Sequence, residues 1–177
     1  MWTVTGSREV YANPWIRVIE DQVVRPDGTP GIYGVVEMRA PSVFVVALTH
    51  ADEVLFVTVD RHTTGTSTEL PAGGTDGEEP LAAAQRELLE ETGHSAREWS
   101  EVGRMNALNG VCRAPEHVFL ATDLERRGAT GMADEGISAV TAIPWVQAVQ
   151  MIGDGRIEDG ESIAALMLAA VALGRVG

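Results

Sequence analysis

The sequence predicts a mixed α/β (α+β) fold with an antiparallel β segment at its N-terminus. Three observations lead to this prediction. Runs of apolar, β-branched residues recur through the first part of the chain, as buried strands require. A helical stretch lies between Pro80 and Gly93, and two more helical stretches follow near the C-terminus. The 177 residues suit one domain of ordinary size with a small appendage.

The first 40 residues combine short strand-like runs with tight turns. Strand-forming residues flank two turn signals, Asn13-Pro14 and Arg25-Pro26-Asp27-Gly28. This alternation predicts a small antiparallel meander over residues 8–38. We therefore expect residues 1–40 to form an N-terminal β segment and residues 41–177 to form the main domain.

Four strands are expected in the main domain. The apolar runs Val43–Leu48 and Val54–Val59 predict buried strands joined by a turn at His50–Glu53. Shorter runs at Val118–Ala121 and Val140–Ile143 predict two later strands.

Three helices are predicted. Pro80 suits a first helical turn and Gly93 a C-terminal stop, which bounds one helix at residues 80–92. Residues 146–152 and 162–173 have the composition of two further helices.

Composition and charge exclude some partners. A formal net charge of −13 disfavours binding to nucleic acid or to an anionic membrane. The N-terminus lacks the order of a signal peptide, and the longest apolar run, Ile163–Leu173, is too short to span a bilayer. Cys112 is the only cysteine, so no intramolecular disulfide can form. A cytoplasmic protein with no membrane and no nucleic-acid partner is the expectation.

The helix at residues 80–92 carries an unusual group of acids. Glu87, Glu90 and Glu91 are three or four positions apart and share a face, while Leu81, Ala84 and Leu88 lie on another that suits packing on a sheet. Clustered carboxylates repel one another, and Mg²⁺ or Mn²⁺ would compensate that repulsion. The alternative is an ordinary solvated acidic face. The glycines before the helix favour the metal, because they allow a backbone to approach phosphate or metal closely; they are Gly73, Gly74 and Gly77.

This segment resembles the signature of the Nudix hydrolases. That signature is Gly, five residues, Glu, seven residues, then Arg-Glu-aliphatic-any-Glu-Glu-any-Gly-aliphatic. Glu78, seven residues and the run Arg86–Gly93 match it in order and spacing. Two positions depart from it: only four residues separate Gly73 from Glu78, and His94 replaces the final aliphatic residue. The resemblance implies a Nudix-type α/β/α sandwich with a mixed sheet, and a pyrophosphatase that uses a divalent metal.

The resemblance also implies roles for individual residues. Glu87, Glu90, Glu91 and the carbonyl of Ala72 would be metal ligands, with Mg²⁺ or Mn²⁺ as the cofactor. Arg86 would hold the glutamates, with Glu78 as its partner.

A general base is expected outside the helix. In relatives acting on ADP-ribose it is a glutamate on a later loop, and Asp123–Gly136 is an acidic, glycine-containing stretch that predicts such a loop. Glu135 is our prediction for the base, and Glu116 is the rival. An ordinary exposed acid is the alternative for Glu135.

The substrate expectation rests on the residues around the motif. Glu69–Gly73 looks like the entry to the motif in ADP-ribose and ADP-sugar pyrophosphatases, whose N-terminal extension commonly helps form a homodimer. The implied reaction converts an ADP-sugar to AMP and a sugar phosphate. Arg61 is expected to contact substrate through paired hydrogen bonds. Trp15 is expected to stack on a base or, alternatively, to pack in the core. The run from His62 to Thr68 predicts a polar loop.

Two other functions remain open at this point. One is a nucleoside triphosphate pyrophosphohydrolase that cleans the nucleotide pool, although small enzymes of that type often lack an N-terminal extension. The other is a non-catalytic Nudix domain that senses a nucleotide sugar. The presence of all the motif glutamates favours an enzyme.

Overall fold

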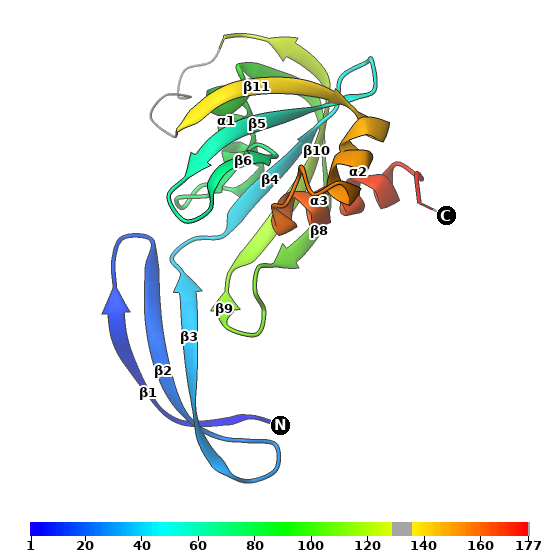
Figure 1. Ribbon diagram of the computed structural model, residues 1–177. Helices are drawn as coiled ribbons and strands as arrows, with labels where there is room; N and C mark the ends of the chain where they lie inside the picture. The colour runs from blue at the N-terminus through cyan, green and yellow to red at the C-terminus, as the bar shows by residue number, and fades with distance from the viewer. Residues whose placement is uncertain (129–135, 177) are drawn as a thin grey trace. The chain divides into compact units, whose positions relative to one another are not determined.

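The computed structural model describes residues 1–128 and 136–176, and Figure 1 shows its strands and helices. The chain forms two compact units. The first comprises Met1–Pro41 and Asn106–Pro115, and the second comprises Ser42–Met105 and Glu116–Gly177. Residues 1–41 make up most of the first unit, which also takes in ten residues from later in the chain. No helix in the described part of the chain has the length and apolar character needed to cross a membrane.

The first unit contains the antiparallel meander that the turn signals predict. Its sheet has the order β1-β2-β3-β9, with antiparallel pairs between β1 and β2 and between β2 and β3. The strands are β1 (Thr3–Ala12), β2 (Ile16–Val24), β3 (Pro30–Met38) and β9 (Cys112–Arg113), the last parallel to β3. Side chains close both turns, because Asn13 accepts backbone hydrogen bonds in the first and Asp27 in the second.

The second unit contains two sheets. One has the order β7-β4-β10-β8, in which β4 and β10 are parallel and β7 is antiparallel to β4. The other is antiparallel, with the order β11-β5-β6. The strands are β4 (Ser42–Ala47), β5 (Glu53–Arg61), β6 (Gly65–Glu69), β7 (Ala72–Gly74), β8 (His94–Asn106), β10 (Pro115–Arg126) and β11 (Ile137–Pro144). Parallel and antiparallel pairs together confirm the mixed strand arrangement.

Helices cover both faces of these strands. They are α1 (Pro80–Thr92), α2 (Trp145–Gly153) and α3 (Gly160–Ala172). Successive side chains of β4 point to opposite faces. Val43 and Val45 therefore join the core beneath α1, while Phe44 and Val46 join the core beneath α2 and α3. Burial on both faces explains why this strand is a continuous apolar run, and it confirms the α/β/α layering.

Three local expectations are wrong. The run from His62 to Thr68 is not all loop, because its second half forms β6, where β-branched threonines suit a strand. The stretch Asp123–Gly136 is not all loop either, because Asp123–Arg126 belong to β10. The long polar strand β8 was not foreseen. Leu81 is 41% exposed, and Ala83 takes its place in the core beneath α1. Leu81 belongs to the first turn of α1, and the small side chain of Ala83 permits close packing of the helix on the sheet.

Candidate active site

Helix α1 supplies the acidic side chains of the site. Pro80 occupies its first turn, and Gly93 ends it with φ of 72°, a left-handed conformation that suits glycine. Ala83, Ala84 and Leu88 pack in the core against β4 and β10. This packing fixes the rotation of the helix and directs the remaining faces toward β7 and solvent.

Strand β7 brings backbone to these acids. Its pairing with β4 places Ala72 opposite Phe44 and Gly73 opposite Val43. The Ala72 amide donates a hydrogen bond to Glu91 Oε2 at 3.0 Å. The Glu87 carboxylate lies against Gly73, since a Cβ at that position would stand 2.7 Å from Oε2 and closer still to Oε1. Two side chains one helical turn apart thus reach two adjacent residues of the strand, Glu91 at Ala72 and Glu87 at Gly73.

The shortened loop after β7 closes as one tight turn. The Glu78 amide donates to the Thr75 carbonyl at 2.8 Å. The two residues between them, Asp76 and Gly77, have φ of 49° and 89°. Positive φ at both central positions is the pattern of a type I′ turn, and an Asp-Gly pair favours it. This turn carries the chain from β7 to α1 with one residue fewer than the family signature has.

Arg86 ties the acids and the loop together. Its guanidinium donates to Glu87 Oε1 at 2.7 Å, Glu90 Oε2 at 3.2 Å, Glu78 Oε2 at 3.4 Å and the Gly74 carbonyl at 3.0 Å. Partial burial acts to lower the pKa of Arg86, but the hydrogen bonds and charges of the surrounding glutamates outweigh it and raise that pKa. Arg86 is therefore a permanent cation that positions carboxylates.

The charge balance of this cluster leaves a place for a cation. Three carboxylates, those of Glu78, Glu87 and Glu90, contact the Arg86 guanidinium, and Glu91 lies one helical turn beyond Glu87. Glu87 and Glu91 are only 3% and 4% exposed. Buried negative charge requires compensation, and hard divalent cations take carboxylate and carbonyl oxygens. Within residues 1–128 and 136–176, no three acidic, histidine or cysteine side chains already stand in a metal-binding arrangement. The fit of a divalent cation to this site therefore rests on Glu87 and Glu91, whose carboxylates converge on the Ala72–Gly73 segment.

Arg61, the residue expected to contact substrate, is held at the end of β5. Glu69 at the end of β6 accepts from its Nη2 at 2.6 Å and from its Nε at 3.2 Å. The hydrogen bond to Glu69 raises the pKa of Arg61 against the effect of burial, and the charges of Glu91 and Asp159 raise it further. Arg61 thus lies within electrostatic reach of both α1 and the start of α3. Its Nη1 has no acceptor among the described residues.

A second group of acids consists of Glu116, Glu161 and Asp159, and the sequence did not predict that these three come together. Glu116 on β10 is 3% exposed, and in the described part of the chain its Oε2 has no hydrogen-bond partner. Burial, with the charge and hydrogen bond of Glu161 and the charge of Asp159, raises the pKa of Glu116 to about 7. Burial also raises the pKa of Glu161. The rival base is therefore protonated more readily than an exposed glutamate, and it lies near the acids at the start of α3.

The start of α3 is tied to the same region by hydrogen bonds. Asp159 caps the helix by accepting from the Ser162 amide at 2.8 Å. Ser162 Oγ in turn accepts from the Leu70 amide at 2.8 Å, although 92 residues separate them. The spacing Asp159-x-x-Ser162 is a helix-start signal in the sequence, but no sequence pattern links Ser162 to Leu70.

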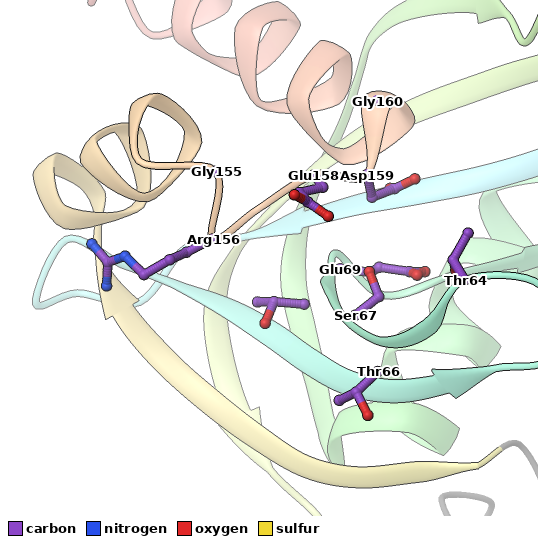
Figure 2. A pocket seen from close by; sticks show the side chains of 10 residues that line it. Thr64, Thr66, Ser67, Glu69, Gly155, Arg156, Glu158, Asp159 and Gly160 are labelled. Carbon is purple, nitrogen blue, oxygen red and sulfur yellow. The ribbon is translucent and has the colours of Figure 1, made fainter.

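A pocket lies between β6 and the connection from α2 to α3 (Figure 2). Its volume is about 500 Å³. The β6 side supplies Glu69 and a group of hydroxyls, and the opposite side supplies Glu158 and Asp159. Because Glu69 also holds Arg61, the pocket adjoins the residue expected to bind phosphate.

Two predicted site residues stay predictions. Trp15 lies in the turn between β1 and β2 of the first unit and is 71% exposed. The alternative that Trp15 packs in the core is therefore wrong. Glu135, the predicted base, lies outside the described residues.

Comparisons with known proteins agree with the geometry. A family model described as the NUDIX domain matches residues 38–166, and one described as the nucleoside diphosphate sugar hydrolase N-terminal domain matches residues 2–36. A GDP-mannose pyrophosphatase from Klebsiella pneumoniae is 33% identical over 100 residues, which are 55% of this chain and 50% of that protein. A GDP-mannose pyrophosphatase from Escherichia coli is 30% identical over 110 residues, or 61% of this chain and 58% of that protein. The matched regions thus span little more than half of these relatives.

The fold has a close counterpart among solved structures. A crystal structure of an ADP compounds hydrolase superimposes with a TM-score of 0.83 and covers 99% of this chain and 97% of its own. The sequences are 19% identical, so this likeness supports the fold and leaves the substrate open.

Proposed function

The chain belongs to the Nudix hydrolase family, and from that premise we propose that it hydrolyses the pyrophosphate bond of a nucleoside diphosphate sugar in a reaction that requires a divalent metal. The observation that carries the proposal is the convergence of the Glu87 and Glu91 carboxylates on the Ala72–Gly73 backbone. Water would add to one phosphorus as the bridging P–O bond breaks. The products are a nucleoside monophosphate and a sugar phosphate.

Each residue of the cluster has a proposed part in this reaction. Glu87, Glu91 and the Ala72 carbonyl would hold Mg²⁺ or Mn²⁺, and Glu90 would serve an additional ion. A bound divalent cation would neutralise charge on the diphosphate and favour ionisation of the attacking water. Arg86 keeps two of these carboxylates in position through its hydrogen bonds.

Arg61 and a glutamate complete the proposed machinery. The Arg61 Nη1 would donate to a phosphate oxygen of the substrate, since its other donors are committed to Glu69. Glu135 would accept the proton of the attacking water, with Glu116 as the rival. Burial and the charge of Glu161 raise the pKa of Glu116 to about 7, which suits a base at neutral pH and keeps this rival in place.

The substrate within this class has two candidates. The segment Glu69–Gly73 favours ADP-ribose or another ADP-sugar, and the names of the sequence relatives favour GDP-mannose. Purified protein should be incubated with ADP-ribose, GDP-mannose and a panel of nucleoside triphosphates, with Mg²⁺ and with chelator. Release of AMP or GMP from a nucleotide sugar, only when metal is present, is the expected result. Cleavage of triphosphates alone would favour the pool-cleaning function, and binding without any turnover would favour a sensor.

We also propose that the protein is a homodimer joined through its N-terminal unit. Strand β1 is an edge strand, and every one of its residues is exposed. Val4, Val10 and Tyr11 are among them, and Trp2, just before the strand, is exposed as well. An exposed, apolar edge strand is a template for pairing with a second chain. Light scattering coupled to gel filtration should give twice the chain mass of 18.9 kDa. The monomer mass at micromolar concentration would refute the proposal.

A further inference from the structure

The pocket between β6 and the α2–α3 connection has lining groups that the protein itself does not use. Thr64, Thr66, Ser67 and Thr68 lie on the β6 side. Within the described chain, none of these four hydroxyls is hydrogen-bonded to another protein group. Strand β6 is also the edge of its sheet, so one side of its backbone is unpaired. The pocket therefore presents many donors and acceptors to a ligand.

The charges in the pocket select the kind of ligand. Glu69, Glu158 and Asp159 are lining carboxylates. Arg156 is the one cation in the lining, but its guanidinium donates to Asp154 at 3.0 Å. In Figure 2 it points away from the hydroxyls on the β6 side. Carboxylates accept hydrogen bonds and repel phosphate. A neutral molecule rich in hydroxyl groups fits this lining, and a phosphate does not.

One lining carboxylate remains available for such a ligand. Glu69 is committed to Arg61, and Asp159 caps α3. Glu158 has no hydrogen bond or ion pair with any described residue, and Figure 2 shows it on the α2–α3 side of the pocket, across from Glu69 and Ser67. A carboxylate facing hydroxyls across a pocket can accept two hydrogen bonds from a vicinal diol.

We infer that this pocket binds the sugar portion of a nucleoside diphosphate sugar, with Glu158 and the β6 hydroxyls as its contacts. The inference rests on the proposed function, and it adds the place where the sugar is recognised. Glu69 links the two regions, because it lines the pocket and holds Arg61. A diphosphate at Arg61 would thus have its sugar directed into the pocket. The volume of about 500 Å³ lies within the range of small-molecule sites.

The test measures binding of the sugar separately from hydrolysis. Isothermal titration without metal would compare GDP-mannose with GDP, and ADP-ribose with ADP, for the full chain. The variants are Glu158→Gln and the double variant Thr66→Val with Thr68→Val. Thr141→Val on β11, an exposed threonine outside the pocket, is the matched control.

In the pocket variants we expect a loss of affinity for the nucleotide sugar and no loss for the nucleoside diphosphate. Wild-type protein should bind at least one nucleotide sugar more tightly than its nucleoside diphosphate. Each pocket variant should weaken that binding about threefold to tenfold, the value of one or two hydrogen bonds, while the affinity for the diphosphate and all affinities of the control stay unchanged.

Three results would overturn the inference. They are no measurable binding of either nucleotide sugar, equal binding of each sugar and its diphosphate by wild type, and equal weakening of both ligands in the variants. Sugar-dependent binding without turnover would leave the pocket in place and refute the proposed hydrolysis. Turnover of a nucleotide sugar by wild type, with unchanged nucleotide-sugar affinity in the pocket variants, would support the proposed hydrolysis and refute the sugar pocket.

Discussion

The Gly73 Cα lies against the carboxylate of Glu87, with no room for a side chain between them. This contact joins the glycine loop to the helix that follows it, and it sets where the Glu87 oxygens lie. Antiparallel pairing with β4 holds Gly73 on one side, and Arg86 holds the carboxylate on the other. The glycine is therefore a positional requirement of the site.

Gly73→Ala should move Glu87 and reduce turnover. The added Cβ would overlap the carboxylate, and a shift of about 1 Å in a catalytic group costs on the order of 100-fold in rate. Gly74→Ala is the control, because its Cβ would meet only the exposed side chain of Asp76, 3.2 Å from Oδ1. Steady-state kinetics on the nucleotide sugar that wild type cleaves would measure both. Equal rates in the two variants would show that Gly73 does not position Glu87.

Glu91→Gln should nearly abolish turnover and leave the protein folded. The amide keeps an oxygen for the Ala72 N–H but loses the charge that a divalent cation needs, so we expect a loss of at least about 100-fold. Glu79→Gln, an exposed acid just before α1, is the control. Product formation and thermal unfolding should be followed together. Activity near that of wild type would exclude the metal role of Glu91.

Arg86→Lys should lower turnover although it keeps the positive charge. An ammonium group is a compact charge and cannot span the three glutamates and the Gly74 carbonyl that the guanidinium contacts. We expect a decrease on the order of tenfold or more in kcat. Arg104→Lys, at an exposed ion pair with Glu101, provides the comparison. If the two lysine variants behave alike, Arg86 is not a positioning residue.

The pKa of Glu116 predicts how stability changes with pH. This pKa is raised from 4.5 to about 7 by burial and by Glu161, so the folded protein holds a proton that the unfolded chain releases near pH 4.5. The stability that this proton gives the folded protein is therefore fully present below pH 4.5 and is lost as the pH rises to about 7. Glu116→Gln imitates the protonated form at every pH. The unfolding free energy of the variant minus that of wild type should therefore rise by on the order of 2 kcal/mol between pH 4.5 and pH 8.

Urea unfolding at several pH values would test this relation. Glu53→Gln is the matched control, because it removes the charge of an acid on β5 that accepts a hydrogen bond from Thr49 and lies outside the Glu116–Glu161 group. Identical profiles for Glu116→Gln and wild type would mean that Glu116 does not hold the proton. The variant also tests the rival base, because a rival base would lose turnover at every pH.

Glu135→Gln should lower kcat with little effect on KM if this residue removes the proton from water. The rising limb of the kcat–pH profile should also disappear, since it reports ionisation of the base. A loss of kcat in Glu116→Gln, with Glu135→Gln unchanged, would transfer the role to Glu116.

The sequence by itself determined the family, the helix that carries the glutamates and the layering. The spacing of Arg86, Glu87, Glu90 and Glu91 places them within one or two helical turns, and that proximity follows from helix geometry alone. The bounds of α1 at residues 80–92 were predictable for a similar reason, because proline and glycine act on the adjacent backbone.

Only the tertiary structure decided which distant residues share the site. The Leu70 amide donates a hydrogen bond to Ser162, 92 residues later in the chain. Glu116 on β10 comes near Glu161 at the start of α3. No local pattern encodes such contacts, since strand order and helix docking place them. The polar strand β6 escaped prediction for a related reason: as an edge strand beside a pocket it needs no apolar face, so its sequence resembles a loop.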